Sequence, residues 1–183
     1  MEEKDLAEAC RRGDGSALRE FYDRYSRPLY GVCRRYLDNS ADADDVFQDG
    51  LIKIISAFGK FSYRGDGSLK AWASRVMVNT ALMHLRERLK ADVLSEEPVQ
   101  DETAAEDPEV SDIPTEVLHG LILSLPDGYR AVLNMYAFEK MSHKEIARAL
   151  GISERTSASQ FLRAKRNLAK KINEYRKNGQ SGK

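Results

Sequence analysis

The sequence predicts an all-α protein made of two small helical domains joined by a flexible acidic linker. Strand signals are almost absent, and apolar residues recur instead at the three- and four-residue spacing of amphipathic helices. The segment 91–114 interrupts this pattern with three prolines, many carboxylates and no apolar period, which is typical of a solvated, extended chain. We therefore expect domains at residues 1–91 and 114–183, with the linker at residues 92–113.

The apolar spacing predicts four helices in each domain. In the first domain they cover residues 3–12, 16–37, 41–58 and 68–90, and Pro28 favours a kink in the second of them. In the second domain they cover residues 115–124, 127–138, 143–150 and 154–176. The side chains expected in the core are Phe47, Leu51, Ile54, Phe58, Leu69, Trp72, Val76 and Met83, followed by Leu118, Leu121, Ile122, Leu125, Val132, Leu133 and Tyr136.

The formal net charge of zero conceals an uneven distribution. Residues 1–90 carry 16 basic and 14 acidic side chains, residues 91–116 carry no basic and 10 acidic ones, and residues 117–183 carry 13 and 5. A basic carboxyl-terminal block is expected of a protein that contacts phosphate, although a solubilising tail has a similar composition. Charge alone therefore leaves both interpretations open.

Other features restrict the class of protein. Cys10 and Cys33 have no metal-ligand spacing and favour a reducing compartment. The three histidines are scattered and accompany no nucleophile pattern, so we expect no catalytic residue, no metal and no cofactor. No apolar run reaches about 18 residues and the first ten residues are polar, so we expect a cytoplasmic protein without a secretion signal or membrane span.

The carboxyl-terminal domain contains the pattern of a helix-turn-helix. Ser142 and Glu145 form a capping box, Gly151 supplies a left-handed turn residue, and Ser153 caps the next helix. In that second helix one side is expected to pack and comprises Ser157, Phe161, Ala164 and Leu168. The opposite side is free to enter a DNA major groove and comprises Arg155, Ala158, Ser159, Leu162, Arg163 and Arg166.

The amino-terminal domain has two further features. The helix at 41–58 carries an acidic face, formed by Asp42, Asp45 and Asp49 and flanked by Gln48 and Ile52. Like charges on one helix face repel, so a basic partner surface would explain them. A favourable acidic first turn is the alternative explanation, but it does not account for Asp49. The second feature is a loop with two glycines, residues 63–67, followed by Ser68 as a helix cap and by a polar edge of Arg75, Asn79 and Arg86.

These motifs resemble two regions of the extracytoplasmic-function group of the sigma-70 family. The stretches DADDVFQDGLIKI, YRGDGS and LKAWASRVMVNTALMHLR are similar to region 2, and LPDGYRAVLNMYAFEKMSHKEIARALGISERTSASQFLRAKRNL is similar to region 4. The resemblance implies a sigma factor, which directs core RNA polymerase to promoters and assists in melting them. It also implies promoter DNA, the β′ clamp helices and β flap of core polymerase, and an anti-sigma factor as partners.

The resemblance assigns roles to residues in three groups. The group expected to dock on the β′ clamp helices of polymerase comprises Asp42, Asp45, Gln48, Asp49 and Ile52. The group expected to bind a flipped base and the melted −10 strand comprises Tyr63, Arg64, Gly65, Asp66, Ser68, Trp72, Arg75, Asn79 and Thr80. The group expected to read the duplex −35 element comprises Arg155, Thr156, Ala158, Ser159, Leu162, Arg163 and Arg166. Flipping a base costs a few kcal/mol of lost stacking, which polar contacts from the loop would offset.

The sequence departs from the family pattern at Ser157. The family usually has a larger apolar residue at this position, so the Ser157 hydroxyl is expected to bond to the helix backbone.

The length of the linker can be compared with the distance between promoter elements. Promoter elements about one and a half DNA turns apart are separated by roughly 50 Å. A linker of some 22 residues reaches at most about 75 Å. As a random coil it averages only about 26 Å, so the tether must stretch, and self-repulsion among its carboxylates favours this.

Two other classes of protein remain as alternatives. A stand-alone helix-turn-helix regulator would bind duplex DNA as a dimer, but it would need neither the acidic face nor the glycine loop before Trp72. An enzyme would need a nucleophile or metal-ligand pattern, and the sequence has neither. The sigma factor is the interpretation that uses both domains.

Overall fold

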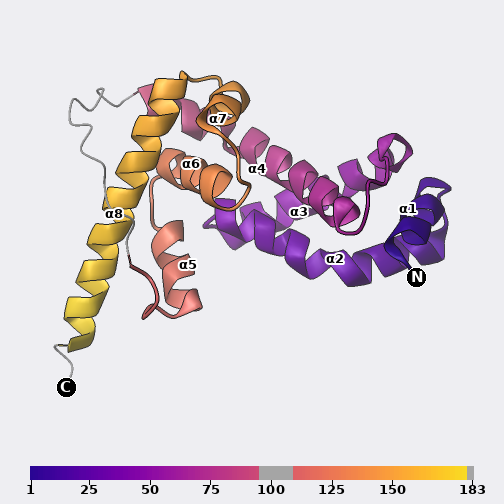
Figure 1. Cartoon of the computed structure of the whole chain (residues 1–183), viewed down its shortest axis with the longest axis horizontal. Helices are drawn as coiled ribbons and strands as arrows, with labels where there is room; N and C mark the ends of the chain where they lie inside the picture. Colours follow the sequence, from indigo (N-terminus) through magenta and orange to yellow (C-terminus); the bar gives the residue numbers. More distant parts are fainter. Residues whose placement is uncertain (95–108, 181–183) are drawn as a thin grey trace. The chain divides into compact units, whose positions relative to one another are not determined.

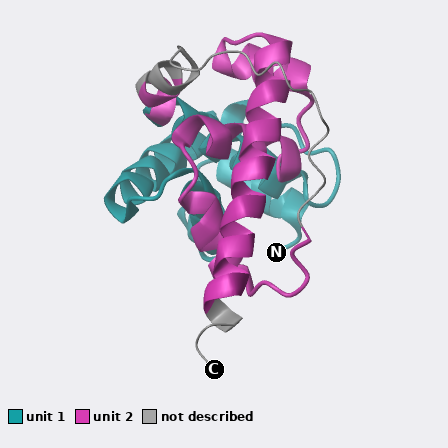
Figure 2. Ribbon diagram, turned by 90° about the vertical axis from the view of Figure 1, so that its left-hand side faces the viewer, with its two compact units in different colours: residues 1–84 teal, residues 85–183 magenta. Residues whose placement is uncertain are grey.

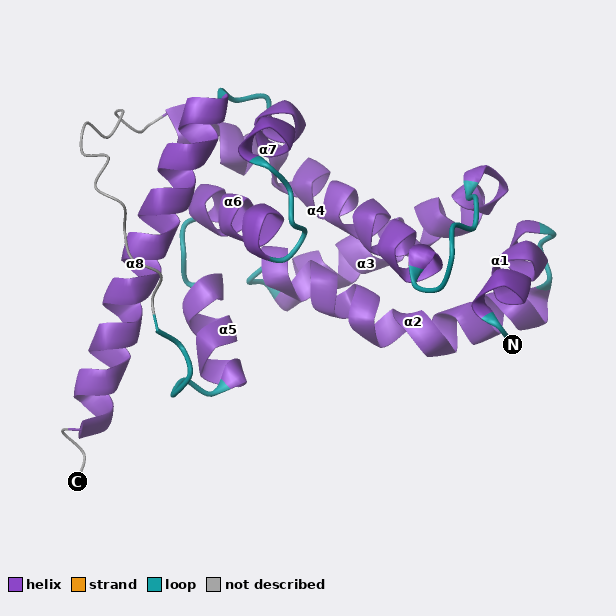
Figure 3. Ribbon diagram, viewed as in Figure 1, coloured by secondary structure: helices purple, strands orange, loops and turns teal. Residues whose placement is uncertain are grey.

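The computed structural model describes residues 1–94 and 109–180, and this part of the chain is helical and contains no strand (Figures 1 and 3). The predicted all-α class is therefore confirmed. The chain divides into two compact units, Met1–His84 and Leu85–Lys183 (Figure 2). The boundary between the units lies within one long helix rather than at its end.

The first unit begins with α1 (Glu3–Arg11) and α2 (Gly15–Tyr36), which runs through Pro28 without interruption. It continues with α3 (Ser40–Ala57) and a short 3₁₀ helix, η1 (Phe58–Lys60), which the sequence did not predict. The long α4 (Ser68–Leu94) crosses from this unit into the next. Asp14 caps α2 by accepting hydrogen bonds from Ser16 N and Ala17 N, so the turn before α2 is held by a side chain.

The buried stripe of α3 differs from the predicted one. Phe47 and Leu51 are only half-buried, and the fully buried positions besides Ile54 are small: Ala43, Val46 and Gly50. A Cβ atom on Gly50 would collide with Met77 Sδ, so α3 and α4 approach closely at this glycine. The ring of Phe47 lies at the flank, with its centroid 5.5 Å from that of Tyr30. Close packing of the two helices thus turns the large side chains outward.

The first part of α4 also buries a different stripe from the predicted one. Leu69 is buried as expected, but the stripe continues through Ala73, Met77 and Ala81, at intervals of four residues. Trp72 and Val76 are half-buried at its flank. Met83 was predicted to be in the core and is 68% exposed. Ala73 and Ala81 on the inner side allow the close approach of α3, so the buried stripe passes through them and leaves Trp72, Val76 and Met83 outside it.

The second unit contains α5 (Thr115–Leu123), α6 (Asp127–Ala137), α7 (His143–Leu150) and α8 (Glu154–Gln180). The inner side of α8 packs on the shorter helices, and the core comprises Ile113, Ile122, Leu125, Leu133, Ala164, Leu168 and Ile172. Tyr136 was predicted to be in this core but is 40% exposed. Its ring instead covers His143 and Phe161, with centroids 4.8 and 4.3 Å away.

A buried arginine holds the turn between α5 and α6. Arg130 is 1% exposed, and its Nη1 donates to the carbonyl oxygens of Leu123 and Leu125 over 2.6 and 3.0 Å. Its Nη2 forms a salt bridge with Asp127. The carbonyl groups at the end of α5 and in the turn after it lack helical partners, and the guanidinium satisfies one of each.

Most of the predicted linker, residues 95–108, lies outside the described residues. Its two described ends depart from an extended chain. Residues 92–94 belong to α4, and Ile113 belongs to the core of the second unit. The domain boundaries predicted from the sequence remain predictions.

Candidate functional site

The acidic face of α3 is exposed over most of its length. Asp45, Gln48 and Asp49 are exposed, and no hydrogen bond or ion pair is assigned to them within the described residues. Ile52 follows one turn later on the same side and is 63% exposed. Carboxylates beside an exposed isoleucine form a surface suited to a partner that is both basic and partly apolar.

Two neighbouring carboxylates are engaged within the first unit. Asp42 is half-buried, and its Oδ1 lies 3.6 Å from His84 Nε2 on α4. Asp44 accepts a hydrogen bond of 2.8 Å from the Tyr30 hydroxyl. The structure therefore separates Asp42, which lies beside His84 of α4, from Asp45 and Asp49, which face solvent. Asp42 therefore lies only at the edge of the acidic face.

The loop before α4 is closed by its own side chains. The Tyr63 hydroxyl donates to Asp66 Oδ1 over 2.6 Å, and this hydrogen bond raises the pKa of Tyr63 to about 12. Gly65 and Gly67 have φ angles of 113° and 85°, in the region that L side chains rarely adopt. Arg64 and Asp66 remain exposed at the tip. The loop is thus preorganised, with a guanidinium and a carboxylate offered to solvent.

The capping of α4 differs from the prediction. Ser68 is the first residue of α4, and its Oγ accepts a hydrogen bond of 3.2 Å from Arg64 N in the loop. The carboxylate at this helix end comes from α1, since Glu3 Oε1 accepts from Leu69 N over 3.0 Å. Glu3 Oε2 also accepts from the Tyr25 hydroxyl over 3.1 Å. Glu3 therefore connects α1, α2 and the end of the loop. Sequence analysis missed it because its partners are remote in the chain.

Trp72 is part of an aromatic cluster rather than a free platform. Its ring centroid lies 5.0 Å from that of Phe61 and 5.5 Å from that of Phe58. The centroid of Phe58 lies 5.2 Å from that of Phe21 on α2. The indole is half-buried, so one side is fixed by packing while the remainder is accessible. This packing orients the ring next to the loop.

The predicted polar edge of α4 is present, but Thr80 is not part of it. Arg75 and Asn79 are exposed on the same side of the helix. Thr80 is 4% exposed, and its hydroxyl donates to Val76 O over 2.9 Å and accepts from Lys53 Nζ at 3.4 Å. Its side chain thus joins α4 to α3. The structure does not bring Thr80 to the surface that the other residues share.

The helix-turn-helix is built as the sequence predicts. Ser142 and Glu145 form the reciprocal capping box at the start of α7. Gly151 has φ 70° and ψ 34°, the left-handed conformation that ends a helix. Ser153 Oγ then accepts a hydrogen bond of 2.9 Å from Thr156 N at the start of α8. These short-range signals fix the turn between the two helices.

The predicted reading face of α8 comprises Arg155, Thr156, Ala158, Ser159, Leu162, Arg163 and Arg166, and all of these side chains are exposed or half-buried. The opposite side contains the buried Ser157, Gln160, Ala164 and Leu168. Gln160, to which the sequence assigned no role, is buried. Phe161, predicted to pack, is half-buried. The two sides of the helix are therefore clearly separated.

The Ser157 hydroxyl is satisfied differently from the prediction. Its Oγ lies 3.0 Å from His143 Nδ1, so the bond crosses from α8 to α7 instead of returning to the helix backbone. The imidazole stacks on Tyr136, and burial lowers the pKa of His143 below its usual value. A neutral imidazole can donate to or accept from the hydroxyl. A small serine at this position leaves room for the histidine ring.

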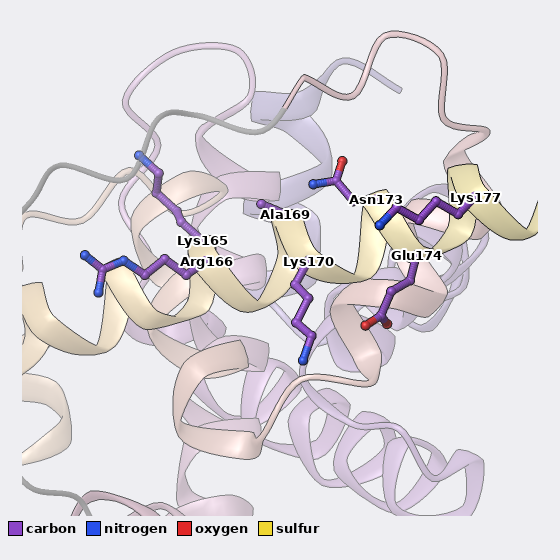
Figure 4. A pocket seen from close by; sticks show the side chains of 7 residues that line it. All are labelled: Lys165, Arg166, Ala169, Lys170, Asn173, Glu174 and Lys177. Atoms are coloured by element: carbon purple, nitrogen blue, oxygen red, sulfur yellow. The ribbon is translucent and has the colours of Figure 1, made fainter.

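The side of α8 that carries Arg166, the last residue of the reading face, remains basic further along the helix. Lys165, Lys170 and Lys177 project from the helix near it, with Glu174 among them (Figure 4). These side chains all belong to α8, so they form an open basic surface along one helix and not an enclosed pocket. Within the described residues there is no group of histidine, cysteine and carboxylate side chains that could hold a metal ion.

Comparisons with known proteins agree with this geometry. The family model described as "Sigma-70 region 2" matches residues 21–90, and that described as "Sigma-70, region 4" matches residues 115–168. The ECF RNA polymerase sigma factor SigM of Mycobacterium tuberculosis is 31% identical over 173 residues, covering 91% of this chain and 82% of that protein. The chain belongs to the extracytoplasmic-function group of the sigma-70 family.

Two further relatives extend the comparison. The RNA polymerase sigma-H factor of Pseudomonas aeruginosa is 29% identical over 183 residues, covering 93% of this chain and 94% of the relative. A solved structure, described as CnrH in complex with the cytosolic domain of CnrY, has the same fold, with a TM-score of 0.52 and 22% identity over 94% of this chain and 97% of that one. As a sigma factor, the chain acts in transcription initiation. In the described residues, no helix has the length and apolar character needed to cross a membrane.

Proposed function

We propose that this sigma factor directs bacterial core RNA polymerase to promoters with two elements, and that each unit contacts a different one. The first unit docks on polymerase and holds the melted −10 strand, and the second reads the −35 element as duplex. The protein supplies no catalytic group and needs no cofactor for this role. Its activity therefore depends on core polymerase.

Docking is assigned to Asp45, Gln48, Asp49 and Ile52, with Asp42 at the edge of the surface. The exposure of these residues supports the assignment, since charged pairs steer association and an apolar side chain supplies area to bury. The proposed partner is the pair of β′ clamp helices. Asp42 is half-buried beside His84 of α4, so it contributes less to this surface than Asp45 and Asp49.

The melted −10 strand is assigned to the loop and to one side of α4. The exposed Arg64 and Asp66 offer polar contacts to a flipped base, beside Tyr63, Gly65 and Ser68. Trp72, Arg75 and Asn79 follow on α4, where an aromatic edge and a guanidinium suit unstacked bases and their phosphates. Thr80 supports this surface from beneath, through its contact with Lys53.

The −35 element is assigned to the reading face of α8. A recognition helix places its first residues near base edges and its later basic residues near phosphate, and the order of Arg155, Ser159, Arg163 and Arg166 fits this arrangement. The β flap of polymerase is the proposed support for this unit.

The observation that carries the proposal is the presence, in one chain, of an exposed acidic–apolar face and an exposed basic helix-turn-helix. A stand-alone regulator would use only the second surface. The matches to regions 2 and 4, in that order, favour the sigma factor.

The test is reconstituted transcription over a library of random promoters, with core polymerase alone and with the added protein. We expect specific transcripts only in the second reaction, from promoters enriched in two elements at a fixed separation. Binding to duplex DNA without any polymerase-dependent transcript would support the stand-alone regulator instead.

An anti-sigma factor is proposed as a further partner, and the cytoplasm as the place of action. The resemblance to the family supports both. The structural neighbour CnrH is itself described in a complex with the cytosolic domain of another protein, CnrY.

A further inference from the structure

The side of α8 that carries the reading face continues beyond the helix-turn-helix. Figure 1 shows α8 (Glu154–Gln180) as one long helix. Three exposed side chains follow the reading face on it: Lys170, Asn173 and Lys177. At about 100° per residue, each of them points within about 40° of the direction of Arg166, the last residue of the reading face. These three residues form the distal stripe.

The distal stripe faces away from the core of the second unit. The packed side of α8 contains Ala164, Leu168 and Ile172, which are buried in the core cluster. These positions lie at least about 130° around the helix from the mean direction of the distal stripe. Arg176 lies on a third side, where its Nε donates to Asp112 Oδ2 over 2.9 Å. The fold therefore leaves the distal stripe at the surface, in line with the reading face.

The outer part of α8 is basic. Its residues 169–180 contain four basic side chains and one acidic one, Glu174. The side chains around the distal stripe form an open surface without an enclosed pocket (Figure 4). Such a surface suits an extended polyanion better than a small molecule, which binds in a concave pocket.

The helix dipole gives an alternative explanation for basic residues near the end of a helix. It accounts for Lys177, which lies in the last turn of α8. It does not account for Lys170, which lies ten residues before the end of α8, because the effect of the dipole falls off beyond the last turn. The region 4 match ends at residue 168, so it assigns no role to either lysine.

A recognition helix in the major groove would bring the distal stripe to the DNA backbone. At about 1.5 Å per residue, Lys170 lies about 16 Å along α8 from Ser159 of the reading face. The major groove is about 12 Å wide, so Lys170 lies past its edge, level with the phosphates. Lysine carries three donors on a flexible stem, and the amide of Asn173 can also donate to a phosphate oxygen. Lys177 lies about 27 Å from Ser159, where the curved DNA surface recedes from a straight helix, so its contribution should be smaller.

We propose that the distal stripe binds the phosphate backbone of the duplex next to the −35 element. The inference rests on the proposed function, in which the reading face of α8 lies in the major groove at that element. Lys170 is the principal contact, and Asn173 and Lys177 add to it. Because phosphate contacts carry no sequence information, the distal stripe increases the affinity for the promoter and leaves the preferred −35 sequence unchanged.

The first experiment measures the salt dependence of promoter binding by core polymerase together with the full-length protein. The variants Lys170→Gln and Lys177→Gln each remove one exposed positive charge from the distal stripe. The matched control is Lys171→Gln, which removes the same charge from the adjacent residue. Lys171 is half-buried and lies about 100° around the helix from Lys170, away from the distal stripe.

The loss of one phosphate contact should reduce the slope of log affinity against log salt concentration by about 0.9. Between roughly 50 and 200 mM salt, the affinity of Lys170→Gln should therefore fall about 3.5-fold less than that of the wild type. The Lys177→Gln variant should show a smaller difference, and Lys171→Gln should follow the wild type. At the lower salt concentration, Lys170→Gln should bind at least about threefold more weakly than the wild type, with the same preferred −35 sequence.

The second experiment locates the contact on the DNA. Single phosphates within about ten base pairs on either side of the −35 element are replaced with uncharged methylphosphonates. At a phosphate that Lys170 contacts, the wild type and Lys171→Gln should each lose at least about threefold in affinity. The Lys170→Gln variant should lose less than about 1.5-fold there, because the contact is already absent and the two changes are not additive.

Three results would overturn the proposal. If Lys170→Gln has the salt slope of the wild type, the distal stripe does not bind phosphate. If no flanking phosphate distinguishes Lys170→Gln from the wild type, the charge does not act beside the −35 element. If Lys170→Gln weakens the binding of core polymerase in the absence of DNA, the distal stripe is a polymerase contact instead. Failure of the proposed function looks different, because polymerase with the wild-type protein would then bind no promoter more tightly than unrelated DNA.

Discussion

Reversing two charges on the acidic face tests the docking assignment most directly. The variant Asp45→Lys/Asp49→Lys changes two exposed side chains that have no assigned hydrogen bond or ion pair within the described residues. Asp49 precedes Lys53 by one helical turn, so the reversal replaces an attraction with a repulsion on α3. Such pairs contribute about 0.3–0.5 kcal/mol, so the cost to stability should stay below about 1 kcal/mol.

The effect on binding should be much larger. Close charge pairs across an interface have coupling energies of about 1.5 kcal/mol or more, so losing two of them costs at least about 3 kcal/mol. Since about 1.4 kcal/mol corresponds to a tenfold change, the affinity for core polymerase should fall by a factor of at least about 100. Repulsion from the new lysines adds to this loss.

The assay is equilibrium binding of fluorescently labelled protein to core polymerase, with circular dichroism as the check that the helices remain. The matched control is Glu8→Lys/Asp23→Lys, which changes the net charge equally at two exposed positions on α1 and α2. The control should bind core polymerase within about threefold of the wild type, because isolated exposed charges outside the docking surface contribute little. If the Asp45/Asp49 variant also bound within threefold, the acidic face would not be the docking surface.

Three other changes test the second unit. Exchanging two residues of the reading face (Ser159→Arg with Arg163→Ser) should alter the preferred −35 sequence in a promoter library and leave the −10 preference intact; an altered −10 preference would mean that the roles of the units are misassigned. Arg130→Ala should lower the free energy of unfolding by about 1–3 kcal/mol, because it leaves two carbonyl groups and the half-buried Asp127 carboxylate without the guanidinium, whereas the exposed Arg148→Ala should cost about 0.5 kcal/mol in the same urea titration. Because burial holds the pKa of His143 below its unfolded value near 6.5, the unfolded state binds more protons there, so stability should fall as the pH drops from about 7.5 to about 5.5; His143→Gln should weaken this dependence, and an unchanged pH profile would refute the assignment.

Local signals explain how much of the fold the sequence could predict. The bounds of α7 and its left-handed Gly151 follow from Ser142, Glu145 and Gly151, whose interactions span only a few residues. The outward position of Arg155 and Arg163 on α8 likewise follows from helical periodicity. Such features depend on the chain near each residue, so a single sequence contains the information.

Interactions between remote residues could not be predicted in the same way. Small residues on α3 allow a neighbouring helix to approach, which turns Phe47 to the flank, and no periodicity on one helix reveals its neighbour. Thr80 has the spacing of a surface residue but faces Lys53. Glu3 reaches the start of α4 from another helix, and Ser157 bonds to His143 instead of its own backbone.

By itself, the sequence determined the all-α class, the helix-turn-helix and the two chemically different surfaces, because these follow from spacing, capping and charge along the chain. Only the tertiary structure decided which side chains of those surfaces are available, and that Ile113 belongs to the core of the second unit. Ile113 shows the physical reason: a residue in an acidic, proline-rich segment becomes part of the core when apolar side chains far along the chain, such as Ile172, pack with it.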